Sequence, residues 1–215
     1  PDIAVMMHNV NDLTTLIYEG EYWNNGARKL LKTSYTRPQY SDIKIKKIIK
    51  SLFPRLYYRM HLLKLKILNK DRYLNDEFYN KRNEIKLIDE EKILKAISNN
   101  LTIFVSICEA YEIIPVLMTQ PNRFKNDIDE KLLNIWWHEM GVTFDEYSNV
   151  YNMINDLIRT IGREKNILVI DLEMKIPKNS KYMYDLVHFT EHGSKVAAGI
   201  IGRELQKYIS VFNDN

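Results

Sequence analysis

The sequence has very little of the residues on which several common protein chemistries depend. Its 215 residues include one cysteine, Cys108, and only seven glycines. A single cysteine cannot form an internal disulfide or a metal cage built from cysteines. No glycine-rich phosphate loop, dinucleotide-binding fingerprint, zinc-type His/Cys spacing or Gly-x-Ser-x-Gly elbow occurs. The usual nucleotide-binding folds and zinc sites therefore lose most of their support.

Long uncharged segments are also missing. The apolar stretch from Leu101 to Met118 is interrupted by Glu109 and Glu112, whereas a bilayer-spanning helix needs about 20 mainly apolar residues. We therefore expect no membrane-spanning helix. Hydrophobic residues at 45% and charged residues at 27% are typical of a globular protein. The length is that of one domain, so we expect a single domain over residues 1–215.

The pattern of apolar residues favours alternating strands and helices. Three short apolar runs are typical of buried parallel strands: residues 3–7, 113–118 and 167–171. Helical spacing of apolar residues occurs at 88–111, 127–140, 144–164 and 193–209. This alternation predicts a three-layer α/β/α sandwich around a mainly parallel sheet, with any site along the carboxyl ends of the strands.

The first strand lies unusually close to the start of the sequence. The run from Ile3 to Met7 follows Pro1 almost at once, and a buried parallel strand seldom opens a domain. We therefore expect the domain to be N-terminally truncated, with at least one preceding βα unit missing. On that hypothesis the strand exposes an unpaired edge or apolar surface.

Residues 43–70 differ in charge from the rest of the chain. They hold nine basic residues and no acidic one, although the net charge of the whole chain is only +3. Their apolar residues follow a helical stripe, which predicts a basic amphipathic helical insertion. A solvated positive face over a packed stripe explains this pattern, and so does contact with an anionic lipid surface or a polyanionic substrate. Nucleic acid is not expected, because no aromatic-interleaved basic motif is present.

Two polar clusters could carry chemistry. The first, His8-Asn9-Val10-Asn11-Asp12, directly follows the first strand, where α/β folds place their sites. Asparagine and aspartate also end strands and cap helices, so a purely structural role explains it equally well.

The second cluster, Asp185-Leu186-Val187-His188, precedes the last helix. An aspartate three residues before a histidine can accept a hydrogen bond from Nδ1 and leave Nε2 free as a general base. A turn-capping aspartate beside an incidental histidine is the structural alternative. His192 is a weaker candidate, because no acidic residue precedes it at the same spacing.

Together the two clusters resemble the SGNH, or GDSL-type, family of serine esterases and lipases. The family's Gly-x-Asn-Asp block corresponds to Asn9-Val10-Asn11-Asp12, and its Asp-x-x-His block to Asp185-Leu186-Val187-His188. Residues 116–121 and 169–172 are similar to the strands between these blocks. The resemblance implies a flavodoxin-like SGNH hydrolase sandwich and covers most of the chain.

The chain departs from the family pattern in two places. Asn9 stands where the family has glycine, and we expect the turn to tolerate its side chain because asparagine accepts left-handed geometry better than most residues. The Gly-Asp-Ser block with the nucleophile and the block with the oxyanion-hole glycine are absent. In the family both precede the asparagine block, so they would lie upstream of Pro1.

The resemblance implies hydrolysis of a carboxylic ester by a Ser-His-Asp triad. His188 would be the general base, Asp185 would orient it, and Asn11 would donate to the oxyanion. No metal or organic cofactor is required. The substrate would be a small-molecule or carbohydrate ester, with O-acetyl groups preferred. An acyltransferase of the same fold, a non-catalytic binding module that has lost the nucleophile, and an unrelated α/β nucleotide or sugar binder remain open.

Overall fold

The computed structural model describes residues 1–22, 86–124 and 141–213. All of these belong to one compact unit, Pro1–Tyr22 together with Asn83–Asn215. The basic segment 43–70 and the predicted helix 127–140 lie outside the described residues. The predictions of an amphipathic insertion and of a single domain over the whole chain therefore stay predictions.

The described residues contain a three-stranded parallel sheet in the order β1-β2-β3. The strands are β1 (Ile3–Met7), β2 (Ile114–Met118) and β3 (Leu168–Ile170). Val5 pairs with Val116, which in turn pairs with Leu168. The three predicted strands are confirmed, with ends that differ by no more than one residue.

Three helices precede or connect these strands: α1 (Val10–Glu19), α5 (Glu90–Ala110) and α7 (Phe144–Glu164). Helix α7 begins at a capping box, in which the Thr143 hydroxyl accepts from the Glu146 backbone and the Glu146 carboxylate accepts from the Thr143 backbone. Helix α1 ends at Gly20, whose φ of 73° is a left-handed geometry that glycine adopts readily. Helix capping was one structural role considered for the strand-end cluster, but no helix was predicted after it, so the sequence reasoning missed α1.

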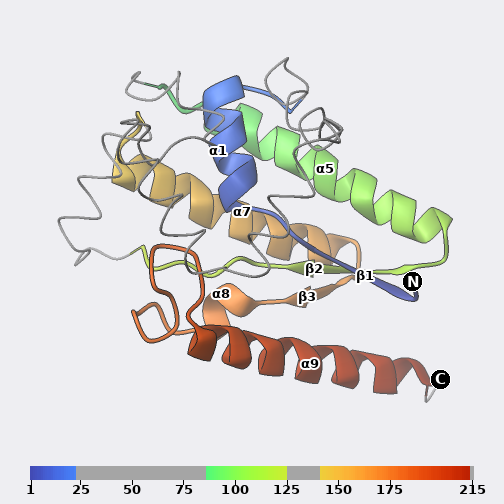
Figure 1. Cartoon of the computed structure of the whole chain (residues 1–215). Helices are drawn as coiled ribbons and strands as arrows, with labels where there is room; N and C mark the ends of the chain where they lie inside the picture. The colour runs from blue at the N-terminus through green and yellow to red at the C-terminus, as the bar shows by residue number, and fades with distance from the viewer. Residues whose placement is uncertain (23–85, 125–140, 214–215) are drawn as a thin grey trace, which may run out of the picture. The chain divides into compact units, whose positions relative to one another are not determined.

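The remaining helices are α8 (Leu172–Lys175) and α9 (Glu191–Asn213). Figure 1 shows α5 and α7 on one side of the sheet and α9 on the other. Val116 and Ile170 pack with Ala197 and Ile200 of α9 in a buried cluster. Leu117, the next residue in β2, points to the opposite face and is also fully buried. The described residues thus form an α/β fold with helices on both faces of a parallel sheet, as predicted.

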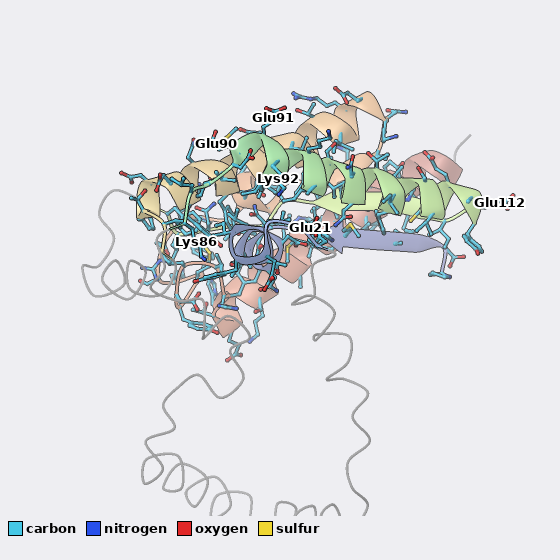
Figure 2. The ribbon with its side chains drawn as sticks, turned by 90° about the horizontal axis from the view of Figure 1, so that it is seen from above. Glu21, Lys86, Glu90, Glu91, Lys92 and Glu112 are labelled. Carbon is cyan, nitrogen blue, oxygen red and sulfur yellow. The ribbon has the colours of Figure 1, made fainter. Side chains whose placement is uncertain are left out.

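Helix α5 corrects one expectation from the sequence. By length and composition it is apolar enough to cross a membrane, although no such helix was expected. The labelled charges Glu90, Glu91 and Glu112 lie at its two ends in Figure 2. Its buried residues face α7 and β2: Ile93, Ile97, Leu101, Val105 and Cys108. Ile103 and Ile107 of the same helix are 54% and 53% exposed, so α5 packs on the described residues with one face only.

Strand β1 is less well covered than its neighbours. Val5 is 43% exposed and Met7 is 41% exposed, whereas Val116 beside Val5 is fully buried. Neighbouring residues in register point to the same face, so Val5 and Met7 face the side on which α9 lies. The expected exposure of apolar surface on this strand is confirmed.

Candidate active site

The Asp185 carboxylate and the His188 imidazole lie in direct contact. Asp185 Oδ2 is 2.7 Å from His188 Nδ1, as the spacing of the motif predicted. Asp185 Oδ1 accepts hydrogen bonds from the backbone N–H groups of Val187 and His188, at 2.9 and 2.7 Å. The imidazole is 64% exposed, so Nε2 is left for a substrate or a nucleophile.

The same hydrogen bonds set the charge of Asp185. Partial burial raises the pKa of this carboxyl, but the two backbone N–H groups and the His188 side chain outweigh it and lower the pKa below its ordinary value. Asp185 is therefore a carboxylate at neutral pH and can stabilise a positive charge on His188.

Hydrogen bonds join the two ends of the loop that carries this pair. The Thr190 hydroxyl donates to the Lys181 carbonyl, and the Thr190 backbone N–H donates to the Tyr182 carbonyl. Gly193 lies so close that a Cβ there would be 1.9 Å from the Tyr182 oxygen. Only glycine permits this approach of α9 to the loop. The sequence thus places His188 on a tied loop rather than on a free one.

The loop is also fixed to the end of β2. The Arg123 backbone N–H donates to the Leu186 carbonyl at 2.8 Å, and Arg123 Nη1 donates to the Met183 carbonyl at 3.0 Å. Figure 1 shows this loop, between α8 and α9, at the edge of the sheet where β2 ends. The histidine motif therefore lies at the carboxyl edge of the strands, where open parallel sheets bind ligands.

Asn9 and Asn11 differ sharply in their surroundings. Asn9 is 2% exposed, and its Nδ2 donates to the Tyr151 carbonyl and to Asn155 Oδ1. Asn11 is exposed on the first turn of α1. Because both amide hydrogens of Asn9 are engaged, Asn11 is the asparagine of this block whose amide could serve an oxyanion. Asn9 has a φ of 179°, which is extended and not the left-handed geometry that was considered.

Helix α7 joins the carboxyl ends of β1 and β2 through Asn155. Its Oδ1 accepts from Asn9 and from the Gln120 backbone N–H, while its Nδ2 donates to the Gln120 carbonyl. The Gln120 side chain in turn accepts from the Val10 backbone N–H. Through Gln120 and Arg123 the asparagine block and the histidine loop share one edge of the sheet. No described hydrogen bond joins Asn11 directly to Asp185 or His188.

Asp12 is held in a separate cluster. Its Oδ1 accepts from the Tyr22 hydroxyl at 3.0 Å and lies 3.0 Å from His8 Nδ1. Burial, followed by the charge of Asp12, raises the pKa of Tyr22. The Tyr22 hydroxyl therefore stays a donor, and this cluster secures the start of α1.

Sequence reasoning missed an ionic cluster at the end of β3. Arg159 of α7 bonds both oxygens of Asp171, at 2.7 and 2.9 Å, and reaches Glu173 at 2.6 Å. The hydrogen bonds to Asp171 and then to Glu173 raise the pKa of Arg159, although burial lowers it. Partial burial raises the pKa of Asp171, but Arg159 and Thr119 outweigh it and lower the pKa. The sequence feature that could have indicated this cluster is Asp171, an aspartate directly after a buried strand.

This ionic cluster is saturated rather than open. Lys178 also contacts Glu173, at 2.5 Å, and Thr119 donates to Asp171 at 2.8 Å. Charges that satisfy one another in this way connect α7, β3 and α8 but leave little to offer a substrate. We therefore place the candidate chemistry at Asp185 and His188.

The described residues supply a base and its orienting carboxylate but no nucleophile. Among them no serine hydroxyl hydrogen-bonds to His188, and none of the serines in the whole sequence follows a Gly-Asp pair. Nor do any three His, Cys, Asp or Glu side chains in the described part form a group that could hold a metal ion. The arrangement can accept a proton at Nε2 and stabilise the resulting imidazolium.

Comparisons with protein-family models, with curated proteins and with solved structures found no match for this chain.

Proposed function

We propose that this chain is part of an SGNH-type carboxylic ester hydrolase. The observation that carries the proposal is the Asp185–His188 pair, with Nδ1 held at 2.7 Å and an exposed imidazole. A carboxylate in this position fixes the tautomer that leaves Nε2 unprotonated, which is what a general base requires. Asp185 makes three hydrogen bonds to the motif, so its orientation does not depend on the histidine alone.

The proposed reaction is acyl transfer in two steps. A serine hydroxyl attacks the ester carbonyl while His188 Nε2 takes its proton, and the same proton then passes to the departing alcohol. Water repeats the sequence on the acyl-serine and releases the acid. Asn11 donates its amide to the oxyanion that forms in each step. None of these steps requires a metal or an organic cofactor.

The serine of this proposal lies upstream of Pro1. Strand β1 pairs with β2 alone among the described residues, and Val5 and Met7 on its α9-facing side are exposed. A further parallel strand at that edge would end at the same carboxyl edge of the sheet as the histidine loop. The arrangement of α5 and α7 on one face and α9 on the other is compatible with a flavodoxin-like order of strands.

The proposed substrate is a small-molecule or carbohydrate ester, with an O-acetyl group as the preferred acyl group. An acyltransferase would use the same residues and differ only in the acceptor of the acyl group. Contact of residues 43–70 with an anionic surface is a separate proposal. It predicts salt-sensitive binding to anionic vesicles that is lost when Lys46, Lys47 and Lys50 are changed to glutamate.

The test compares two histidines in the protein extended to include its upstream coding sequence. His188→Ala is expected to lower hydrolysis of short-chain p-nitrophenyl esters by at least about 10³-fold. His192→Ala is the matched control, because His192 lies four residues away and its ring contacts Tyr182 instead. Equal activity of His188→Ala and the unmodified protein would refute the proposal. An extended protein without hydrolysis or acyl transfer would favour the binding module.

A further inference from the structure

We propose that Tyr184 is a positioning residue that holds the imidazole of His188 in the orientation general-base catalysis needs. The inference gives the proposed function a further residue and rests on it for its catalytic meaning. The two rings are nearly parallel, with an interplanar angle of 13° and centroids 5.7 Å apart. This separation lies in the range of offset-stacked aromatic pairs.

The exposure of His188 makes a second contact necessary. The imidazole is 64% exposed, and Asp185 holds it through one ring nitrogen only. An exposed pair of this kind is weak on its own, because water competes for the bond and the side chain retains freedom. The Tyr184 ring lies nearly parallel to the imidazole and offset from it. It therefore limits, on that side, the rotation that a single hydrogen bond at Nδ1 permits.

The backbone presents Tyr184 for this contact. Its N–H donates to the His188 carbonyl at 3.0 Å, which closes the turn that contains Asp185. Tyr184 and Asp185 are therefore neighbours at the start of one short hydrogen-bonded turn that ends at His188, and both side chains reach the imidazole. Tyr184 itself is 65% exposed. A large aromatic ring so poorly buried contributes little to the core, which leaves the contact with His188 as its described packing.

The first experiment observes His188 directly in the 215-residue chain, so it does not depend on esterase activity. Nuclear magnetic resonance would follow the ring protons and ring nitrogens of His188 in Tyr184→Leu and Tyr184→Phe. We expect leucine to remove the ring-current shift of His188 and to lower the fraction of the tautomer with Nδ1 protonated. Phenylalanine should retain both, because the hydroxyl plays no part in the stack.

The control is Tyr111→Leu. Tyr111 is 75% exposed and caps the C-terminal end of α5, near the start of β2 and so at the opposite edge of the sheet from His188. This substitution should leave the His188 resonances unchanged. An unchanged tautomer balance and unchanged ring shifts in Tyr184→Leu would overturn the inference.

The second experiment measures catalysis in the upstream-extended protein. Tyr184→Leu is expected to lower kcat about tenfold with KM unchanged, since a misoriented base slows proton transfer without weakening substrate binding. Tyr184→Phe should restore kcat. A rise in KM alone would overturn the positioning role and assign Tyr184 to substrate binding. Absence of any esterase activity would count against the proposed function, while the resonance experiment would still decide the role of Tyr184.

Discussion

Two histidine–aspartate pairs lie among the described residues, and their environments are opposite. In the pair at the start of α1, His8 and Asp12 are only 21% and 19% exposed, and Asp12 also accepts from Tyr22. In the loop pair, His188 and Asp185 are 64% and 35% exposed. The distances from Nδ1 to the carboxylate are 3.0 and 2.7 Å, but only the loop pair is hydrogen-bonded: His8 Nδ1 has no hydrogen-bond partner among the described residues.

The comparison shows that the residue pair alone does not identify a reactive site. The carboxylate of Asp12 is shared with a tyrosine hydroxyl, and its cluster joins β1 to α1. The carboxylate of Asp185 is saturated by its own motif and leaves the imidazole at the surface. A general base must reach a reacting proton and be held in one orientation, so accessibility and the Nδ1 hydrogen bond together separate the two pairs.

The largest expected effect is on kcat, and it distinguishes the histidines of the two pairs. In the upstream-extended protein, His188→Ala should reduce kcat by at least about 10³-fold, because the serine hydroxyl needs a base near neutral pH. His8→Ala should reduce kcat by less than about tenfold, with its main effect on the melting temperature. Ester hydrolysis and thermal denaturation of both variants check this. A larger loss of kcat in His8→Ala would transfer the catalytic role to the first pair.

The next prediction separates the two asparagines beside the first pair. Asn11→Ala should lower kcat about 10²-fold with little change in stability, because Asn11 is exposed and its proposed role is in the transition state. Asn9→Ala should instead reduce the free energy of unfolding by about 1–3 kcal/mol, since it removes two buried hydrogen bonds. Denaturant unfolding and steady-state kinetics measure both. Equal destabilisation by the two variants would favour a purely structural role for Asn11.

A third prediction concerns Gly193, which packs against the loop that carries Asp185 and His188. Gly193→Ala should lower the free energy of unfolding by about 1–3 kcal/mol, because its Cβ would overlap the Tyr182 carbonyl. Gly202→Ala is the matched control on the same helix, where a Cβ would meet nothing within 4 Å. It should be neutral or stabilise α9 by up to about 1 kcal/mol. Similar melting temperatures for the two variants would show that the loop does not need this close approach.

The smallest expected effect concerns pH. The pKa of Asp185 is lowered in the folded chain, so the unfolded chain binds its proton at higher pH, near the ordinary value of about 3.9. The contribution of Asp185 to stability is therefore fully present above that pH and is lost as pH falls through the lower folded pKa. Unfolding of Asp185→Asn between about pH 5 and pH 2 should lack this component. An identical pH dependence in both proteins would contradict the prediction.

Part of the fold could be read from local patterns alone. Strand β1 and helix α7 begin and end where the apolar pattern predicted, at Ile3–Met7 and Phe144–Glu164. These segments have strong periodicity and clear polar boundaries, so local physics suffices. Helix α1 was missed because its first turn, Val10-Asn11-Asp12, contains residues that also favour turns. Its packing against α5 outweighs that local preference.

The candidate site likewise contains one contact that the sequence predicts and others that it does not. Asp185 and His188 are three residues apart, so their hydrogen bond forms within one turn and the sequence predicts it. The Arg159–Asp171 bond was not predictable, because α7 and β3 must first pack together to make it. The same holds for Asn155, whose amide reaches Gln120 across 35 residues.

The sequence by itself determined the alternation of strands and helices and the contact within the Asp185–His188 motif. Both depend on interactions between residues that are close in the chain. The tertiary structure alone decided that His188 is accessible while His8 is mostly buried, which asparagine is buried, and that Arg123 fixes the loop to the carboxyl edge of the sheet. These properties depend on contacts between distant segments, and burial and hydrogen bonding across the fold select among side chains that are alike in the sequence.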